Sequence, residues 1–227
     1  MIRRSQKYSA VLFDLDGTLV EFKFKVNESR QALINFLTSL HFDMSKINLE
    51  TKTQRIFDIV LEQSKNDLAR FEYVRVELSK ILEEYEFKGF SEAKPHPGSL
   101  SLLKHLKEAQ VLCALVTNSG RKPVDSILGA FGFLPYLDLI LTRDDVELMK
   151  PEAQGIMKAL EILHVKQDQV IFVGDSVIDI QAARKAGISC IGLTQGMSTS
   201  KILSDEGPDY LISSIEKVED IVLTEHI

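Results

Sequence analysis

The sequence predicts an α/β protein: a Rossmann-like parallel sheet core covered by helices on both faces, with an inserted all-helical segment. From about residue 96 onward, continuous apolar runs alternate with segments of helical periodicity. That alternation is typical of parallel strands buried between two layers of helices. Earlier in the chain, one apolar run at residues 9–13 is followed by a long stretch, residues 26–85, with a helical pattern throughout. The first strand therefore precedes the insertion and the remaining strands follow it.

The inserted segment reads as a small bundle of helices. Asn27 is a plausible N-cap for its first helix, and the Pro- and Gly-containing stretch 94–98 reads as a hinge or linker. The apolar faces recur at helical spacing and comprise Leu33, Phe36, Leu37 and Leu40, then Ile56, Phe57, Val60 and Leu61, then Phe71, Val74, Leu78, Ile81, Leu82 and Tyr85. We expect residues 20–95 to form this helical insertion and residues 1–19 and 96–227 to form the core.

After the linker, helices and strands alternate. Helical faces include Leu102, Val124, Ile156 and Ala182, and Gly187 is a good C′ residue to end the last of these helices. The strands expected between and after these helices cover residues 111–116, 137–141, 170–173 and 188–193.

Composition narrows the class of protein. The chain has 227 residues, of which 44% are hydrophobic and 26% charged, as expected for a globular protein. Its formal charge of -6 argues against a general nucleic-acid surface and against a polybasic membrane contact. No apolar run approaches a membrane-spanning length, and no apolar segment before Val11 could serve as a signal peptide. We therefore expect a cytoplasmic protein without nucleic-acid or membrane partners.

The cysteines and histidines of the chain do not indicate a redox site or a zinc site. Cys113 and Cys190 both lie in apolar, strand-like runs, which favours buried, inert thiols over a redox pair. The five histidines are scattered and none has zinc-ligand spacing with a cysteine or another histidine. A zinc site is not expected.

Two carboxylates follow the first strand, in the stretch Phe13-Asp14-Leu15-Asp16-Gly17-Thr18-Leu19. Residues i and i+2 of an extended chain point the same way, so Asp14 and Asp16 would repel each other unless a positive charge lies between them. A magnesium ion would supply that charge, since it prefers hard oxygen ligands. Alternatively, Asp16-Gly17 forms a hairpin turn and Asp14 is a solvated strand end. The stretch alone leaves both interpretations open.

Polar clusters also follow the later strands. They are Thr117-Asn118-Ser119, then Lys150-Pro151, then Gly174-Asp175-Ser176 with Asp179. Each has a simpler explanation, because Thr117, Ser119, Asp175 or Ser176 could cap a helix and Pro151 could occupy a first helical position. In open parallel sheets, however, sites form beyond the carboxyl ends of the strands. Clusters at successive strand ends therefore favour one shared site over capping alone.

These residues resemble the four motifs of the haloacid dehalogenase superfamily of phosphotransferases. The matching motifs are Asp14-Leu15-Asp16-Gly17-Thr18, Thr117-Asn118, Lys150-Pro151, and Gly174-Asp175-Ser176 with Asp179. The resemblance covers residues 7 to 212, and the helical insertion lies where the family places its cap. The stretches Thr117-Asn118-Ser119-Gly120 and Thr142-Arg143-Asp144-Asp145 are similar to the phosphoglycolate phosphatase branch. Glu152-Ala153 departs from the Asp-Pro of many relatives, at a position without a proposed ligand.

The resemblance implies a catalytic role for each matching residue. Asp14 would attack phosphorus and form an aspartyl-phosphate. Asp16 would protonate the leaving alkoxide and then activate the water that hydrolyses the intermediate. Thr117 and the backbone N–H of Asn118 would bind the phosphoryl group, and Lys150 would compensate its charge.

It also implies a magnesium ion held by Asp14, the backbone carbonyl of Asp16 and the carboxylate of Asp175. Thr18 would fix the loop through its hydroxyl. Asp179 would orient a metal-bound water or Lys150 and would not bind the metal directly.

The same resemblance narrows the reaction. Dehalogenases and phosphonatases of the superfamily lack an acid at the position of Asp16, so this chain is expected to act on phosphate esters. A helical cap of this size favours a small phosphorylated metabolite, such as a phosphoglycolate-like, sugar or nucleotide phosphate. Some arginines of the insertion could bind a substrate carboxylate through two hydrogen bonds, although their residue type favours plain surface positions. They are Arg30, Arg55, Arg70 and Arg75.

Two alternatives remain open at this point. A phosphomutase would use the same aspartyl-phosphate but return the phosphoryl group to a second hydroxyl. A non-catalytic binding module on this fold would be expected to lose a nucleophile, a metal ligand or the lysine, and none is lost here. No feature of the sequence specifies an oligomeric state.

Overall fold

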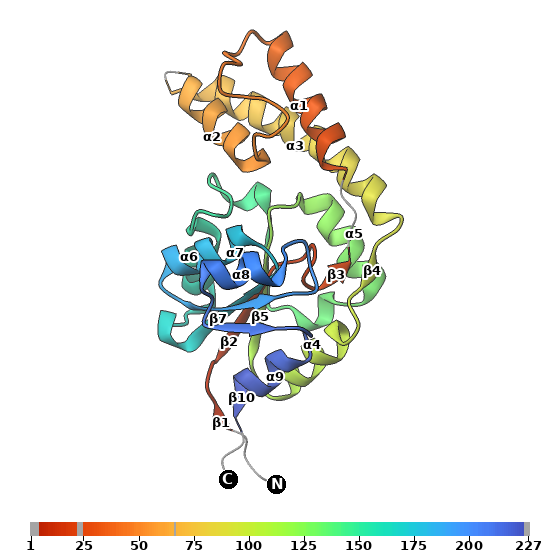
Figure 1. Cartoon of the computed structure of the whole chain (residues 1–227), viewed down its shortest axis with the longest axis vertical. Coiled ribbons are helices and arrows are strands. Elements are labelled where there is room, and N and C mark those ends of the chain that lie inside the picture. The colour runs from red at the N-terminus through yellow and green to blue at the C-terminus, as the bar shows by residue number, and fades with distance from the viewer. Residues whose placement is uncertain (1–4, 22–24, 66, 225–227) are drawn as a thin grey trace. The chain divides into compact units, whose positions relative to one another are not determined.

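A parallel sheet forms the centre of the α/β part of the chain (Figure 1). The computed structural model describes residues 5–21, 25–65 and 67–224. The sheet has the strand order β6-β5-β2-β7-β8-β9, and all neighbouring strands are parallel. Its strands are β2 (Ala10–Phe13), β5 (Leu112–Val116), β6 (Leu139–Leu141), β7 (Val170–Gly174), β8 (Ser189–Leu193) and β9 (Tyr210–Ile212). The predicted α/β class is confirmed.

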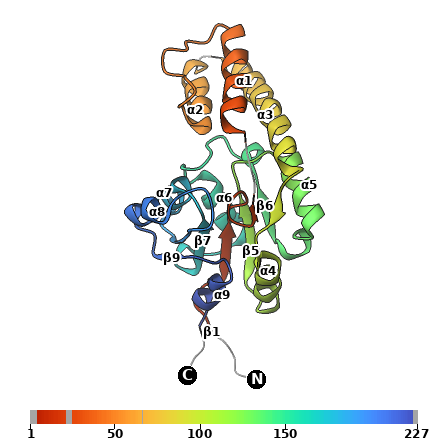
Figure 2. The same ribbon diagram turned by 45° about the vertical axis from the view of Figure 1, so that its right-hand side comes forward.

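Helices cover both faces of this sheet. Figure 2 shows α7 and α8 on one side and α4 and α5 on the other. The helices of the α/β part are α4 (Ser99–Glu108), α5 (Arg121–Phe131), α6 (Gln154–Leu163), α7 (Val177–Ala186), α8 (Ser200–Glu206) and α9 (Lys217–Val222). Short 3₁₀ turns cover Leu134–Tyr136, Arg143–Asp145 and Gln167–Gln169. Gly187 ends α7 with a φ of 68°, as the sequence predicted.

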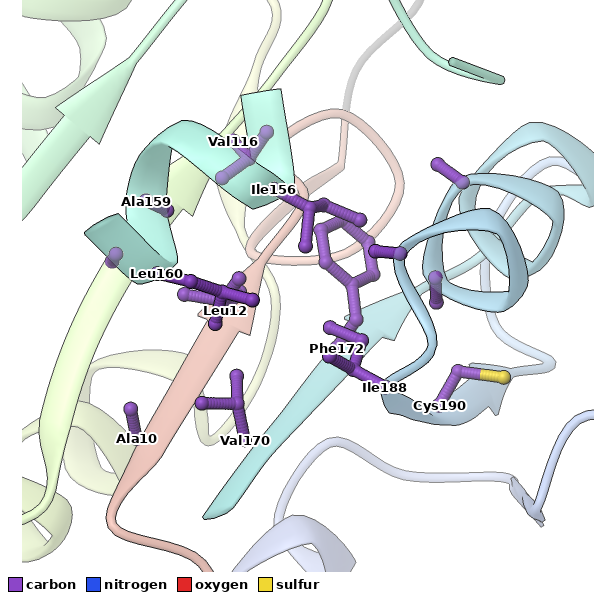
Figure 3. Close-up of a cluster of buried hydrophobic side chains, with 14 of the residues drawn as sticks. Ala10, Leu12, Val116, Ile156, Ala159, Leu160, Val170, Phe172, Ile188 and Cys190 are labelled. Atoms are coloured by element: carbon purple, nitrogen blue, oxygen red, sulfur yellow. The ribbon is translucent and has the colours of Figure 1, made fainter. Parts of the chain in front are cut away.

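Burial on both faces explains why the strands are apolar without alternation. Figure 3 shows Leu12 of β2 and Phe172 of β7 in one cluster with Ile156 of α6, and all three side chains are fully buried. The intervening residues Val11 and Phe13 are also fully buried, and their side chains leave the opposite face of the strand. Each such side chain contributes about 1.5–3 kcal/mol by leaving water.

The helical segment forms a compact unit of its own, Lys23–Glu92. It contains α1 (Val26–Ser39), α2 (Thr53–Gln63) and α3 (Leu68–Phe90), and α3 packs against both other helices. The predicted apolar faces supply its core, including the buried Leu33, Ile56 and Leu78. The expectation for Asn27 is wrong: α1 already begins at Val26 with Lys25 at the N-cap, so Asn27 lies inside the first turn.

Short strands at the two ends of this segment were not predicted. β3 (Val20–Glu21) pairs antiparallel with β4 (Lys94–Pro95). By its contacts this ribbon belongs to the α/β unit, which combines Met1–Phe22 with Ala93–Ile227. A second short ribbon joins β1 (Ser5–Gln6) to β10 (Leu223–Thr224). The predicted boundaries at 20 and 95, and the role of the segment as a cap, stay predictions.

Within the described parts of the chain, none of the helices is both long enough and apolar enough to cross a bilayer.

Candidate functional site

The buried lysine Lys150 joins two carboxylates at the carboxyl edge of the sheet. Its Nζ lies 2.6 Å from Asp14 Oδ1 and 2.7 Å from Asp179 Oδ1. Asp14 directly follows β2, and Asp179 lies in the first turn of α7, which follows β7. β2 and β7 are neighbouring parallel strands, so their carboxyl ends bring these two residues together. The alternative interpretation of Asp14 as a solvated strand end is wrong, because the residue is 7% exposed.

The carboxylate of Asp175 is enclosed by backbone. Its Oδ2 accepts a hydrogen bond from Met197 N at 2.5 Å, and its Oδ1 accepts one from Thr18 Oγ1 at 3.3 Å. A Cβ atom on Gly17 or on Gly196 would collide with this carboxylate. Gly17 also has a φ of +88°, which L-residues with side chains rarely adopt. Two glycines therefore permit the close approach of two loops to Asp175.

Three carboxylates gather at this edge. Oxygens of Asp14, Asp175 and Asp179 lie within 4.8 Å of one another. Among the residues that the structure describes, this is the one group of three or more His, Cys, Asp or Glu residues close enough to hold a metal ion. Lys150 compensates only part of the charge of three buried carboxylates, and hard oxygen donors of this kind suit Mg²⁺. The residues present therefore fit a magnesium ion.

Burial and the excess of negative charge together shift the pKa values of these groups. Burial raises the pKa of Asp14 to about 6, although the Lys150 ammonium opposes the increase. Burial, together with the charges of Asp179 and Asp14, raises the pKa of Asp175 to about 8. For Lys150, burial alone would lower the pKa, but the two carboxylates outweigh it and the pKa lies above its usual value. A further cation would favour the ionised form of both carboxyl groups.

The raised pKa of Asp175 makes the metal-free protein sensitive to pH. A carboxyl group with a raised folded-state pKa stabilises the fold below its unfolded pKa, near 4, and that stabilisation is lost as the pH rises toward about 8. We expect Asp175→Asn, which cannot ionise, to melt higher than the unchanged protein in chelator at about pH 8, by roughly 5 °C or more. The difference should shrink at about pH 5, and a pH-independent difference would contradict the assignment. Thermal melts in chelator at both pH values measure it.

Asp16 lies apart from the carboxylate cluster. Its Oδ2 accepts a hydrogen bond from Ser119 Oγ, so its side chain reaches toward the end of β5. Gly17 N donates to Val20 O at 2.8 Å, which closes a tight turn directly after Asp16. The alternative interpretation of a hairpin turn at Asp16-Gly17 is wrong, because β2 pairs in parallel with β5 and β7 and β3 pairs with β4. The turn instead carries Asp16 to the same edge as Asp14.

Thr117 and Asn118 occupy the end of β5. The Thr117 hydroxyl accepts a hydrogen bond from Ser119 N at 3.1 Å. The Asn118 carboxamide hydrogen-bonds to the backbone of Lys150. The loop leads into α5, whose N-cap residue is Gly120. At the start of this helix Arg121 N donates to Asp144 Oδ2 at 2.8 Å, so an acidic side chain lies at this N-terminus, where the helix dipole favours negative charge.

Helix capping accounts for some of these polar residues but not for the site. Ser176 is the N-cap of α7, and its N and Oγ donate to Asp179 Oδ2 at 3.1 and 2.5 Å. Asp179 thus bonds Ser176 through one oxygen and Lys150 through the other. Pro151 is not a first helical residue, because α6 begins at Gln154. Capping alone therefore does not explain the positions of Asp175 or Lys150.

Sequence reasoning missed three residues that contact this loop system. The buried His96 donates its backbone N–H to Leu19 O at 2.9 Å, and its ring forms a hydrogen bond with the Gly17 backbone. Burial lowers the pKa of His96. Gly196 and Met197 enclose Asp175. The glycine after the last predicted strand was an available signal for that loop, whereas His96 had none beyond its place in the linker.

The arginines considered as substrate contacts have partners inside the helical unit. Arg30 Nη1 donates to Leu49 O at 3.0 Å, and Arg70 Nη2 donates to Leu40 O at 3.1 Å. Arg55 is paired with Glu62 at 2.9 Å and Arg75 lies 3.7 Å from Glu72. These contacts support the helical unit.

Two other features lie away from the carboxylate cluster. Cys113 and Cys190 are free and buried, and burial raises the pKa of the Cys113 thiol to about 12, which suits an inert side chain. An open pocket of about 1110 Å³ is lined by residues such as Met157, Asp168 and Gly187. Asp168 precedes β7 and Gly187 precedes β8, so this pocket lies at the amino-terminal edge of the sheet, opposite the carboxylate cluster.

Comparison with known proteins places this fold and site in one family. The haloacid dehalogenase-like hydrolase family matches residues 11–193, which include every residue discussed at the carboxyl edge except those of the loop around Met197. The chain belongs to the haloacid dehalogenase-like hydrolases. The predicted family and the predicted enzyme class, a hydrolase of phosphate esters, are confirmed.

Curated relatives cover nearly the whole chain. A validoxylamine A 7′-phosphate phosphatase from Streptomyces hygroscopicus is 30% identical over 189 residues, 82% of this chain and 86% of the relative. A phosphoglycolate phosphatase from Pseudomonas fluorescens is 27% identical over 92% of this chain and 77% of the relative. A pyrophosphatase PpaX from Halalkalibacterium halodurans is 27% identical over 94% of this chain and 96% of the relative. The relatives thus differ in the substrates that their names state.

Solved structures share the fold. A structure described as a haloacid dehalogenase-like hydrolase from Bacteroides fragilis has a TM-score of 0.67 at 24% identity, covering 93% of this chain and 100% of that one. A haloacid dehalogenase-like hydrolase from Streptococcus pneumoniae has a TM-score of 0.61 at 21% identity, covering 95% and 98%. At these identities the likeness concerns the fold alone.

Proposed function

We propose that this protein is a magnesium-dependent phosphatase that hydrolyses a small phosphomonoester through an aspartyl-phosphate on Asp14. The observation that carries the proposal is the buried Asp14 carboxylate, which the Lys150 ammonium holds at 2.6 Å beside Asp175 and Asp179. A carboxylate is a weak nucleophile toward a dianion, so it requires positioning and charge compensation more than activation. This arrangement supplies both.

In the proposed reaction, Asp14 Oδ attacks phosphorus in line and the leaving alkoxide departs on the opposite side. Lys150 neutralises charge on the transferring oxygens. The Thr117 hydroxyl accepts from Ser119 N, so its own proton remains available for a phosphoryl oxygen, as does the Asn118 backbone N–H. Water then attacks the aspartyl-phosphate, which releases phosphate and restores Asp14.

Asp16 moves the protons of both half-reactions. It gives a proton to the leaving alkoxide and takes one from the attacking water. The hydrogen bond from Ser119 Oγ fixes the orientation of its carboxyl group. Asp16 thus acts as the general acid and base, and Asp14 acts as the nucleophile.

A magnesium ion fits the acidic edge of this site. Asp14, Asp175 and the backbone carbonyl of Asp16 would hold it, while Asp179 stays bonded to Lys150 and Ser176. When bound, the ion supplies electrostatic stabilisation of the phosphoryl oxygens. Thr18 contributes by donating to Asp175, which orients that carboxylate.

The substrate class is proposed from two lines of support. The relatives are named for phosphoglycolate, for validoxylamine A 7′-phosphate and for pyrophosphate, all of which are small molecules. In the sequence, the helical unit falls between the first and second motifs, where the family inserts its cap, and as a cap it would restrict access for macromolecules. We therefore propose a small phosphorylated metabolite as substrate, in the cytoplasm, without nucleic-acid or membrane partners. A panel of phosphomonoesters assayed with magnesium tests this, and no release of phosphate from any of them would contradict it.

Removal of the metal should abolish the activity. Without a divalent cation, the carboxylates of Asp14 and Asp175 repel the phosphoryl dianion, so chelator should reduce hydrolysis of an aryl phosphate to background. Added Mg²⁺ should restore it. Full turnover in excess chelator would refute the metal assignment.

A further inference from the structure

We propose that the side chain of Asn118 is a positioning residue for Lys150, acting by hydrogen-bonding both polar groups of the lysine backbone. The inference rests on the proposed function, in which Lys150 compensates charge on the transferring phosphoryl group. It assigns a role to the Asn118 carboxamide that is separate from the phosphoryl contact proposed for the Asn118 backbone N–H.

Lys150 needs such support because of where its backbone lies. The chain leaves β6 through the 3₁₀ turn Arg143–Asp145, and Lys150 lies in the irregular segment between that turn and α6. In the sheet, β5 lies between β6 and β2. The lysine must therefore reach past β5 to meet Asp14 and Asp179, and its backbone has no strand ladder to hold it. Small displacements of this backbone would move the ammonium away from both carboxylates.

The Asn118 carboxamide replaces the missing ladder. Lys150 N donates to Asn118 Oδ1 at 3.0 Å, and Asn118 Nδ2 donates to Lys150 O at 2.9 Å. A neighbouring strand would bond a residue in the same way, with one acceptor and one donor. The clamp joins residues 32 positions apart in the sequence.

The backbone around Asn118 is itself fixed by hydrogen bonds. Thr117 N donates to Leu141 O at 3.0 Å, which continues the β5–β6 pairing by one residue. Arg143 Nη1 donates to Asn118 O at 2.9 Å. The carboxamide therefore projects from a fixed backbone, and its position can be transmitted to Lys150.

Only a carboxamide of this length offers both groups. Aspartate would keep the acceptor for Lys150 N, lose the donor for Lys150 O and add a negative charge near the phosphoryl site. Alanine would remove both bonds. The chain also offers a matched control: Gln154 Oε1 accepts from Glu147 N at 2.8 Å and from Leu148 N at 2.7 Å. Gln154 thus clamps the same segment without contacting Lys150.

A double-mutant cycle tests the catalytic part of the inference. With an aryl phosphate and saturating Mg²⁺, Asn118→Ala should lower kcat about 100-fold, with a smaller change in KM, because a displacement of about 1 Å is enough for such a loss. In the Lys150→Ala background the same substitution should change kcat only a few-fold, since the group that it positions is gone. Equal fold-changes in the two backgrounds would overturn the inference. Gln154→Ala should stay within about twofold of the unchanged protein.

A second measurement does not depend on activity. Hydrogen exchange at the Lys150 backbone amide should accelerate in Asn118→Ala and stay unchanged in Gln154→Ala, at temperatures well below both melting points. Unchanged exchange in Asn118→Ala would overturn the clamp itself. If the unchanged protein released no phosphate from any ester, the proposed function would fail, and exchange at Lys150 would still decide whether Asn118 holds this backbone.

Discussion

Asp14→Asn should lower hydrolysis of an aryl phosphate by at least about 10⁴-fold, a loss typical of removing a covalent nucleophile. The carboxamide cannot attack phosphorus, and it also weakens the acidic edge that is proposed to hold magnesium. Lys150 would remain paired with Asp179 at 2.7 Å, so the ammonium is not left unpaired. Because burial raises the pKa of Asp14 to about 6, replacing it with a neutral group should not destabilise the fold.

The control for this prediction is the melting temperature. It should stay at or above that of the unchanged protein near neutral pH, so that the lost activity cannot be attributed to unfolding. Retention of more than about 1% of the activity in a folded Asp14→Asn protein would contradict the nucleophile assignment.

Asp16→Asn should produce a loss that depends on the leaving group. An alkyl phosphate requires protonation of the departing oxygen, so its hydrolysis should fall by about 10³-fold, within the range expected for general acid–base catalysis. An activated aryl ester leaves without a proton, so transfer of its phosphoryl group to Asp14 should be far less affected. The asparagine keeps the shape of Asp16 and an acceptor for Ser119 Oγ. Steady-state hydrolysis should still be slow, because no base activates water for the second step.

Rates measured with a series of esters of graded leaving-group acidity test this. The ratio of unchanged to variant rate for the first step should increase as the leaving group becomes more basic. A constant ratio across the series would mean that Asp16 acts structurally and not as the acid.

The sequence was informative about the sheet edge because of a simple physical rule. Parallel strands place their carboxyl ends together, so Asp14, Thr117 and Asp175 could be expected at one edge once their strands were identified. The structure places them there, directly after β2, β5 and β7. Continuous apolar runs identified these strands because helices cover both faces.

The contacts that shape the site could not be predicted in this way. Asp175 meets Met197, and Asn118 meets Lys150, but these pairs come from irregular loops whose path follows no hydrophobic period. The Gly17 conformation, with its φ of +88°, matters because of the Asp175 carboxylate packed against it. Local sequence shows a turn glycine there but not the partner that requires it.

The shortest elements were missed for a related reason. The two-residue strands β3 and β4 are defined by their mutual pairing, Val20 with Pro95 and Glu21 with Lys94. Two residues are too few to show a period. The N-cap prediction at Asn27 was wrong for a similar reason, because a shift of a few residues at a helix end changes the apolar pattern very little.

The most direct test of the central claim is the detection of the phosphoryl group on Asp14. Asp16→Asn and Asp14→Asn would each be mixed with an activated aryl phosphate and Mg²⁺, quenched rapidly in acid and examined as intact proteins by mass spectrometry. We expect one added phosphoryl group in Asp16→Asn, where the intermediate forms and then stalls, and none in Asp14→Asn. A phosphoryl adduct that persists in Asp14→Asn would contradict the account.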